Sequence, residues 1–530
     1  MTAALAERPV HAPQRPGDPR RAMLALARVE AARLLRHPAV LAGLLLFAGP
    51  EVLRWLTGRA DRFPVLQDAD WSPQLLALLV LGGGALIGAN LAALRADRHA
   101  TTGWYDTLVL PPSWRTGGFL LSVVPFAVVV AALAGARIAL LAALPGAAGR
   151  PNPYELALLP AVALLFGAAG VLLARLARTM IAAPLLLLAA AVVVFAAGLS
   201  SGASRVRWLL PVAVEEPPMP VPVALMSRPA GWHLAYVAGL VTLVSVAALA
   251  VAGARGRRLM VAGAAGLAAA VLAGSVQLLP MSGAVRDARA TAAERPAAMQ
   301  RCRPVGSVTY CAFGDFASWT GGWDAVVHGV LRAVPAEVAG RPLVVRQRLS
   351  TVDQLTNGRM VSAEEGAAAA LAWQRVEAGA GTPDAVTVGT RWGDDLSEVG
   401  LAGLVAHRIV TRQPAPAHGP VCGARGVLIA WLAGQATPET AAGLREADAT
   451  SWGGVPFGDM QFPVGFSVPD REMAVAWALL KRPTGDVAAV VARSWGELTA
   501  AGTSADRAGE LFGVPVPPLP RAEERIRCDG

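Results

Sequence analysis

The feature that most constrains this chain is a series of long apolar segments in its first half. A helix needs about 20 mostly apolar residues to cross a bilayer. Seven segments meet this requirement, and we expect spans at roughly 39–56, 74–94, 119–144, 154–175, 181–199, 233–253 and 259–280. Residues 281–530 read instead like a soluble domain with ordinary charge. The sequence therefore predicts a polytopic α-helical membrane protein of about seven transmembrane helices, followed by a soluble domain.

The composition favours a membrane protein and argues against nucleic-acid binding. Hydrophobic residues make up 54% of the 530 residues, charged residues only 16%, and the mean hydropathy is +0.46. Soluble domains usually carry about 25% charged residues. The net charge is +9, and its arginines lie beside the apolar segments without the interleaved aromatics of a nucleic-acid surface. We therefore expect no nucleic-acid partner and interpret these arginines as topology signals.

Arginine placement predicts the orientation, because arginine-rich loops stay in the cytoplasm. Arginines gather before the first span and after the second, fourth and sixth, at 20–36, 95–115, 175–178 and 255–258. Seven spans with these loops inside put the C-terminal part outside. We expect a cytoplasmic N-terminus over 1–38, a transmembrane domain over 39–280 and an extracytoplasmic domain over 281–530. The Ala, Gly and Arg bias is typical of a GC-rich bacterial genome, so the expected location is the bacterial cell membrane.

An amphipathic helix is expected just before the first span, over residues 20–37. Met23, Leu24, Ala27, Ala31, Leu34 and Leu35 form its apolar arc, and Arg28, Arg33 and Arg36 form the opposite one. Pro38 ends the pattern. Such a helix lies in the membrane interface with its arginines toward lipid head groups. The alternative is that these residues are simply the cytoplasmic start of the first span.

Four polar residues are expected within the spans. Glu51 and Arg54 are three residues apart, so they can pair on one helix face and lower the cost of their depth. Arg137 lies near the outer end of the third span and either contributes to a substrate path or reaches the interface. Asn90 lies near the inner end of the second span, where an amide can hydrogen-bond between helices.

All four cysteines, Cys302, Cys311, Cys422 and Cys528, lie in the C-terminal part. An even number confined to one region suits disulfides in an oxidising compartment, in agreement with the orientation predicted from the arginines. The spacing of Cys302 and Cys311 suits a short hairpin closed by a disulfide. The alternative is four buried free thiols. A zinc site is disfavoured because no Cys-x-x-Cys pair or histidine set accompanies them.

The C-terminal part predicts an α-rich α+β domain. Residues 343–349 and 385–389 read as strands, and helical patterns lie near 322–333, 363–378, 396–410, 470–481 and 485–500. The His-Glu-x-x-His motif is missing, and the one Gly-x-Ser-x-Gly match, at 198–202, ends a span. We therefore expect no enzyme of either class, no catalytic residues and no metal ligands. The many tryptophans are expected in the core, or as the lining of a pocket for an amphiphilic ligand.

The loop between the second and third spans mixes charged, polar and aromatic residues before a Pro-Pro break. The positions of interest are Arg95, Arg98, Thr101, Thr102, Trp104, Tyr105 and Asp106. Together with the preceding amphipathic helix, the pattern over residues 20–255 resembles the membrane subunits of type-2 ABC exporters. The resemblance implies that this loop is a coupling helix that docks on a separate ATPase subunit. The alternative for its aromatic residues is a simple belt at the membrane interface.

The chain lacks a phosphate-binding P-loop of its own, because its single lysine, Lys481, follows no glycine-rich loop. The resemblance therefore implies a permease that binds no cofactor, with ATP and Mg on the partner ATPase. It also implies export and a homodimer or a second permease subunit. Residues 200–232 would form either a re-entrant segment or a plain outer loop.

The seventh span and the added C-terminal domain depart from the usual six-span pattern of this family. Two alternatives to the permease therefore stay open. One is a membrane-anchored protein whose outer domain binds or senses a ligand. The other is an enzyme of a type that these motifs do not reveal.

Overall fold

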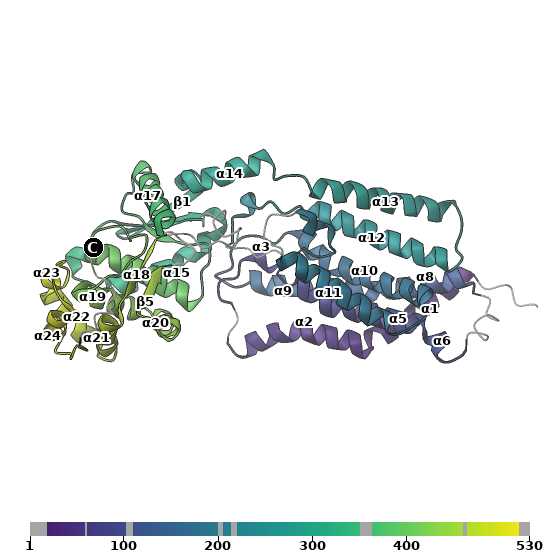
Figure 1. Cartoon of the computed structure of the whole chain (residues 1–530), viewed down its shortest axis with the longest axis horizontal. Helices are drawn as coiled ribbons and strands as arrows, with labels where there is room; N and C mark the ends of the chain where they lie inside the picture. The colour runs from purple at the N-terminus through teal and green to yellow at the C-terminus, as the bar shows by residue number, and fades with distance from the viewer. Residues whose placement is uncertain are drawn as a thin grey trace, which may run out of the picture.

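The computed structural model describes residues 18–58, 61–70, 72–101, 110–199, 205–213, 220–349, 363–458 and 464–518. Its first part is a bundle of long apolar helices, and its second part, which we call the C-terminal domain, lies at one end of that bundle (Figure 1). The helix α14 (Gly283–Glu294) leads from the bundle into this domain.

Within the described residues, six helical segments are long and apolar enough to cross a membrane, which indicates a multi-pass membrane protein. Two are composite: Leu66–Ala93 and Pro112–Ala142. The first contains α3 (Leu66–Ala69), α4 (Gln74–Leu76), a π-helical segment η1 (Ala77–Gly82) and α5 (Gly83–Ala93), and the second contains α8 (Pro112–Ser122) and α9 (Val124–Ala142). The other four are α2 (Pro38–Leu56), α10 (Pro153–Leu176), α12 (Ala230–Val251) and α13 (Arg257–Gln277).

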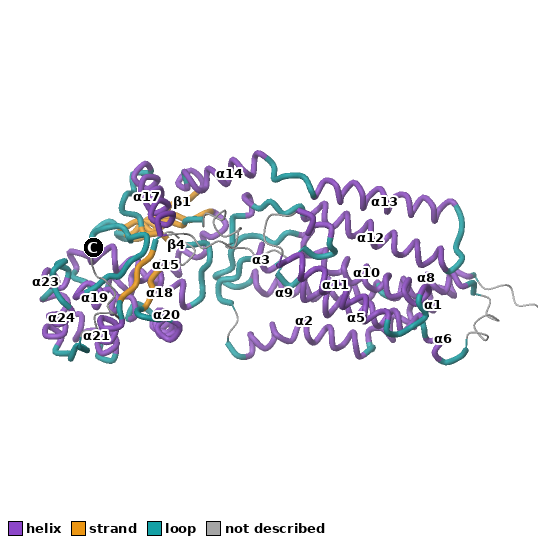
Figure 2. Tube along the Cα trace, viewed as in Figure 1, coloured by secondary structure: helices purple, strands orange, loops and turns teal. Residues whose placement is uncertain are grey.

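Among the described residues, six segments and not the expected seven meet this length and hydropathy. The segment expected at 181–199 is the apolar helix α11 (Ala182–Leu199), with 18 residues. It is one residue shorter than α2, the shortest of the six helical segments counted above. It leads to η2 (Arg205–Leu209), where the Trp208 carbonyl accepts a hydrogen bond from Gln277 at the end of α13 (2.8 Å). α11 therefore returns the chain along the bundle between the end of α10 and the start of α12 (Figure 2).

Small residues allow the bundle helices to approach closely. A Cβ atom added at Gly43 of α2 would lie 2.4 Å from the Val80 carbonyl oxygen, and one at Gly170 of α10 would lie 2.3 Å from the Leu86 carbonyl oxygen. Asn90 of α5 is fully buried and donates a hydrogen bond to the Gly170 carbonyl (3.2 Å). In lipid the hydrophobic effect does not drive helices together, so close packing and hydrogen bonds of this kind hold them instead.

The outer faces of the bundle carry large apolar side chains that no protein atoms cover. Leu45 and Leu56 of α2 are 71% and 80% exposed, and Leu272 of α13 is 65% exposed. Exposed apolar surface of this extent is costly in water but not in hydrocarbon. These faces are therefore suited to contact with lipid.

The C-terminal domain begins with a mixed four-stranded sheet in the order β1-β2-β3-β4. The strands are β1 (Gln300–Val305), β2 (Val308–Phe313), β3 (Leu343–Gln347) and β4 (Val386–Val388). β1 is antiparallel to β2, whereas β2, β3 and β4 are parallel. The helices α15 (Thr320–Leu331) and α17 (Ala363–Gly379) make the parallel connections. The strands predicted at 343–349 and 385–389 are confirmed as β3 and β4, which pair in parallel within a small, mixed sheet of a helix-rich domain.

The rest of the domain is largely helical. Its elements are α16 (Ala336–Ala339), α18 (Asp395–Thr411), α19 (Gly423–Gly434), α20 (Pro438–Thr450), α21 (Asp470–Leu480), α22 (Thr484–Arg493), α23 (Trp495–Leu498), α24 (Ala505–Phe512) and a hairpin of β5 (Val455–Gly458) and β6 (Gly465–Val468). α19 is buried along nearly its whole length because its residues 427–433 are all apolar. This short apolar helix is a core element of the domain.

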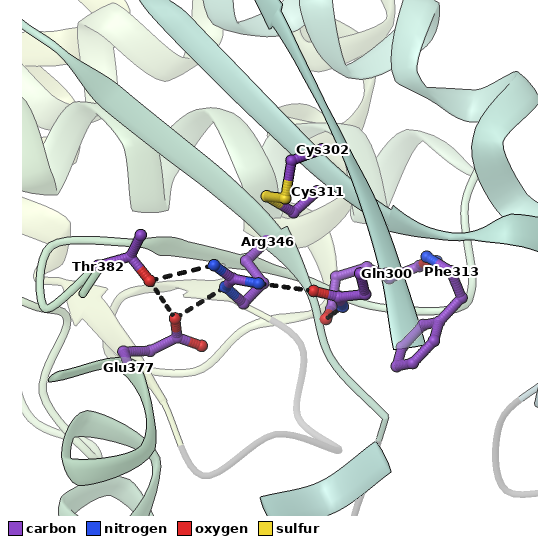
Figure 3. The surroundings of a disulfide bond; sticks show 8 residues. Gln300, Cys302, Cys311, Phe313, Arg346, Glu377 and Thr382 are labelled. Atoms are coloured by element: carbon purple, nitrogen blue, oxygen red, sulfur yellow. Dashed lines mark hydrogen bonds and ion pairs between the residues drawn. A yellow bond between two sulfur atoms is a disulfide. The ribbon is translucent and has the colours of Figure 1, made fainter. Parts of the chain in front are cut away.

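The predicted hairpin disulfide is confirmed. Cys302 and Cys311 face each other across β1 and β2 and form a disulfide (Figure 3), and Gly306 adopts the positive φ (+58°) that the tight turn between the strands requires. Cys422 is also disulfide-bonded. The described part of the chain contains no free cysteine, so the alternative of free thiols is wrong there. Cys528 lies outside the described residues.

The bundle and the C-terminal domain share one hydrophobic core. Ala148, from the loop between α9 and α10, and Leu225, from η3 (Val223–Leu225), are buried in the same cluster as Trp319 and Trp323 of the domain. The Trp319 indole N–H donates a hydrogen bond to the Gly146 carbonyl (2.8 Å). The domain is therefore packed onto the bundle, in addition to its covalent link through α13.

Polar contacts reinforce this joint. The Asp315 carbonyl accepts from the Gly149 amide (2.8 Å), and its carboxylate accepts from the Val223 amide (2.7 Å). Arg62, from the loop after α2, forms ion pairs with Glu398 (3.2 Å) and Glu439 (2.9 Å) of the domain. Three separate bundle loops thus hold the domain.

Replacing Trp319 by alanine is expected to destabilise this joint. The change removes a fully buried indole and its hydrogen bond to Gly146, and the expected cost is about 3–5 kcal/mol. Trp452→Ala is the matched control, because Trp452 is 98% exposed and its loss is expected to change stability by less than about 0.5 kcal/mol. Thermal and denaturant unfolding of the purified protein measure both. Equal effects of the two variants would contradict the shared core.

Acid is expected to destabilise the C-terminal domain through His407. Burial, aided by Arg408 and Arg425, lowers the pKa of His407 from 6.5 to about 4. The folded state keeps this imidazole neutral while the unfolded state binds a proton, so stability falls as the pH drops from 6.5 to about 4. The loss is roughly 3 kcal/mol. His407→Leu is expected to flatten the pH dependence of unfolding in this window, whereas substitution of the exposed His418 by leucine leaves it unchanged. An unaltered slope in His407→Leu would refute this assignment.

Candidate functional site

The predicted amphipathic helix is present as α1 (Pro19–Leu35), which packs against α8. The Asp18 carboxylate caps its first turn, and the helix ends shortly before Pro38 starts α2. Arg28, Arg33 and Arg36 are exposed, as expected, while Ala27, Ala31 and Leu34 are buried. The predicted apolar arc is wrong in two respects, since Leu24 is 48% exposed and Glu30 lies on the buried face. The helix turns this face toward α8 and α5 because its small alanines fit there.

Glu30 connects α1 to the loop after the second span. Its side chain is only 4% exposed. The Arg95 Nη1 donates to both of its carboxylate oxygens (2.6 and 2.8 Å), and the Arg33 Nη1 donates to Oε1 (2.9 Å). A buried carboxylate with two guanidinium partners fixes the geometry of the two segments, because its charge has to stay paired. We call this group the Glu30 cluster.

The candidate coupling residues fall partly within the described chain. Arg95 and Arg98 form the ends of a short helix, α6 (Arg95–Arg98), that continues directly from α5 through Leu94. Arg98 is exposed, and the Thr101 hydroxyl donates to the Ala96 carbonyl (3.3 Å). The other four candidates, Thr102, Trp104, Tyr105 and Asp106, lie outside the described residues. The structure therefore brings Arg95 to α1 and leaves Arg98 facing solvent.

The same end of the bundle gathers the exposed arginines. α1, α6, the start of α8 and the turn between α12 and α13 meet there, opposite the C-terminal domain (Figure 1). Exposed arginines include Arg28, Arg36, Arg98, Arg255 and Arg258. We call it the arginine end and the opposite one the domain end. The bundle therefore has a strongly basic surface at the end farthest from the C-terminal domain.

The predicted pair of Glu51 and Arg54 forms, and Arg137 joins it. Glu51 makes an ion pair with Arg54 on α2, and its Oε2 lies 3.6 Å from the Nε of Arg137 on α9. Arg137 also donates to the Ala69 carbonyl (2.5 Å). One carboxylate therefore serves two guanidiniums, and the group lies toward the domain end of the bundle.

A second polar group lies at the domain end, and it was not predicted from the sequence. Glu155, in the first turn of α10, accepts from the Gln74 amide (2.6 Å) and from the Arg228 Nε (3.0 Å), and both Glu155 and Arg228 are more than nine-tenths buried. The Arg228 guanidinium also lies 5.5 Å from the ring centre of Trp208. The one signal in the sequence that could have predicted this group is the position of Glu155 at the start of a long apolar segment.

Next to it, His233 of α12 bridges two connections. Its Nδ1 lies 3.2 Å from the Gln277 Oε1 and its Nε2 lies 3.3 Å from the Pro211 carbonyl. His233 and Gln277 are both about 1% exposed. The stretch around η2 thus packs on the domain end of α12 and α13, whereas η3 packs on α14. Among the described residues of this segment before α12, only these two short stretches are helical, and both are 3₁₀.

The chemistry available at these positions is ionic contact and hydrogen bonding. Among the described residues, no group of three or more His, Cys, Asp or Glu side chains is arranged to hold a metal ion. Comparison with protein-family models, curated proteins and solved structures found no match to this chain. The polytopic membrane architecture is therefore the most specific assignment that these observations give.

A double-substitution cycle tests the Glu51 group. Glu51→Gln is expected to destabilise the bundle because it leaves Arg54 and Arg137 without a counter-charge in a low-dielectric region. Adding Arg137→Met is expected to recover part of the loss, with a coupling of about 0.5–3 kcal/mol. Thermal unfolding in lipid nanodiscs measures each variant, and the exposed Arg150→Met serves as a control that adds independently. Strict additivity of Glu51→Gln and Arg137→Met would contradict the shared carboxylate.

Proposed function

We propose that this chain is the permease subunit of an ATP-driven exporter that works with a separate ATPase subunit. The observation that carries the proposal is the Glu30 cluster, in which α1 and α6 are fixed to each other at the arginine end. An amphipathic helix and a loop helix held together beside an exposed basic surface form a suitable docking site for a partner. The partner would bind ATP and Mg, and this chain would bind neither.

The packing of α5 supports a mechanical role for α6. α5 runs straight into α6, and nearly all of its residues are buried against α10, α2 and η1. Protein interiors are densely packed, so a displacement of α6 has to move α5 and its neighbours. Movement produced by ATP hydrolysis on the partner would thereby reach the Glu155 and Arg228 group at the opposite end of the bundle.

The proposed orientation follows from charge. The arginine end would face the cytoplasm by the positive-inside rule. The C-terminal domain would then lie outside a bacterial cell membrane, a location compatible with its disulfide. Export toward that domain, and a homodimer or a second permease subunit completing the path, are part of the same proposal.

Charge reversal in the Glu30 cluster tests the function. Glu30→Arg and Arg95→Glu each place like charges together, so each is expected to abolish recovery of the ATPase with the tagged protein from native membranes. The double variant restores opposite charges and is expected to recover most of the complex. Arg255→Glu removes a cation from the same end without touching α1, and it is expected to reduce recovery only slightly.

The readout is the stoichiometry of a co-purifying protein that binds ATP. The amount of each variant in the membrane, measured in parallel, separates loss of docking from loss of folding. Absence of any such protein from the unsubstituted chain under gentle solubilisation would overturn the permease proposal. It would favour the membrane-anchored ligand-binding alternative instead.

A further inference from the structure

The second span contains a stretch that is helical but not α-helical. In η1 the hydrogen bonds are π-helical, and the Gly83 amide at its end donates to the Leu78 carbonyl five residues earlier. A π-helical turn holds one residue more than an α-helical turn, and such turns are rare and occur frequently at functional sites. Sharp kinks in helices occur at these turns, at glycines and at prolines. η1 is therefore a position where the span can bend.

Three consecutive glycines, residues 82–84, lie where η1 meets α5, and each faces a different helix. The nearest atoms to a Cβ added at each in turn would be the Phe166 ring of α10 at 3.3 Å, the Leu187 Cδ2 of α11 at 2.7 Å and the Ala39 carbonyl oxygen of α2 at 2.9 Å. Glycine also accepts changes of backbone angle more readily than other residues. The span is thus both closely surrounded and easily bent at this level.

A second interruption lies at the same level in the neighbouring helix α10. Pro160 is inside this helix, and it has no amide to donate to the Leu156 carbonyl four residues earlier. α10 packs along η1 and α5, and the contacts occur in the same order along both chains, at Gln74 and Glu155, at Gly82 and Phe166, and at Asn90 and Gly170. η1 and Pro160 both fall between the first two of these contacts. The two interruptions therefore lie beside each other in parallel helices.

On either side of this level, the second span is held to other elements. Toward the arginine end, α5 continues into α6, where Arg95 pairs with the buried Glu30 of α1. Toward the domain end, Gln74 donates to Glu155 of α10 (2.6 Å). A helix fixed near both ends changes shape most easily where its α-helical hydrogen bonds are already interrupted, and here that place is η1.

We propose that the bundle bends at the level of η1 and Pro160, so that the angle between its arginine-end half and its domain-end half changes. The moving piece comprises α1, α5, α6 and the C-terminal part of α10, because Glu30 joins α1 to α6 and Asn90 joins α5 to α10. The bend changes the direction of α10 between Gly170 and Glu155.

α12 and α13 supply the frame against which this piece moves. Both are described over their whole length, are α-helical throughout and contain no proline. The ATPase that would drive the movement rests on the proposed function. The bend itself is a property of this chain alone, so the two can fail separately.

A bend of ordinary size gives a displacement that can be measured. At about 1.5 Å per residue, the stretch from Gly83 to Arg98 is about 22 Å long. A bend of about 20°, the size of a sharp helix kink, moves its tip by about 8 Å. The moving tip is α6, the same helix that would contact the partner.

Spin-label distance measurements on the full-length protein in lipid nanodiscs test the bend. The labels are attached through p-acetylphenylalanine, which leaves the disulfides intact. One pair joins Arg98 of α6 to Arg255 in the turn between α12 and α13, and the control pair joins Arg28 of α1 to Arg98, within the moving piece. All three positions are exposed. The distance distribution of the first pair is expected to be at least about twofold wider than that of the control pair. Equal widths would overturn the proposal.

Two changes remove the interruptions. Deletion of Leu79 takes the extra residue out of the π-helical stretch and keeps the flanking helix faces in register. Pro160→Ala restores an amide opposite the Leu156 carbonyl. Each is expected to narrow the distribution between Arg98 and Arg255, and the two together are expected to reduce it to the width of the control pair.

Pro50→Ala is the matched control. Pro50 is also inside a helix, α2, but it lies about two turns from Gly43, where α2 meets η1. This variant is expected to leave the width unchanged. Unfolding temperatures identify variants that fold, and an unchanged width in both folded variants would refute the pivot. If neither variant folds, the two label pairs in the unsubstituted chain still decide the outcome.

Discussion

The burial of bundle loops in the core of the C-terminal domain is the constraint on which the rest of the structure depends. Gly146, Ala148 and Leu225 belong to connections between membrane-spanning helices, yet they pack with Trp319 and its neighbours. A domain held only by α13 would pivot on one chain. Here the positions of α9, α10 and α12 at the domain end are tied to the domain, so a rearrangement of those helices has to move it or open the core.

One arrangement of charges, a glutamate paired with two arginines, occurs at three places in the molecule. Glu30 at the arginine end, Glu51 near the domain end and Glu377 in the C-terminal domain each serve two arginines. In each group the carboxylate is the scarcer partner, in keeping with the net charge of +9. Breaking such a group leaves two arginines without their shared counter-charge, and in the Glu377 group both arginines, Arg346 and Arg348, are buried, so each group fixes local geometry more than it adds stability. This distinguishes them from exposed surface pairs, which contribute little.

Much of the fold and part of the candidate site followed from short-range patterns. The apolar segments gave the six spans, because the length of a membrane helix is set by the bilayer. The Glu51–Arg54 pair and the Cys302–Cys311 hairpin were predictable because their members are three and nine residues apart. The seventh expected segment is the apolar helix α11, which is shorter than the other six but also runs along the bundle (Figure 2). The parallel pairing of β2, β3 and β4 was not predicted, because the sequence of a strand does not specify which other strand it pairs with.

The sequence by itself determined where the chain can cross a membrane, which residues start and end α1, and which half holds the disulfide. These properties depend on composition and on spacings of a few residues. Only the tertiary structure decided that Arg95 reaches Glu30, that Arg228 reaches Glu155 and that Arg62 reaches Glu439, pairs separated by 65, 73 and 377 positions. The physical reason is that burial removes water from a charge and forces it to find whichever partner the packing of distant segments supplies.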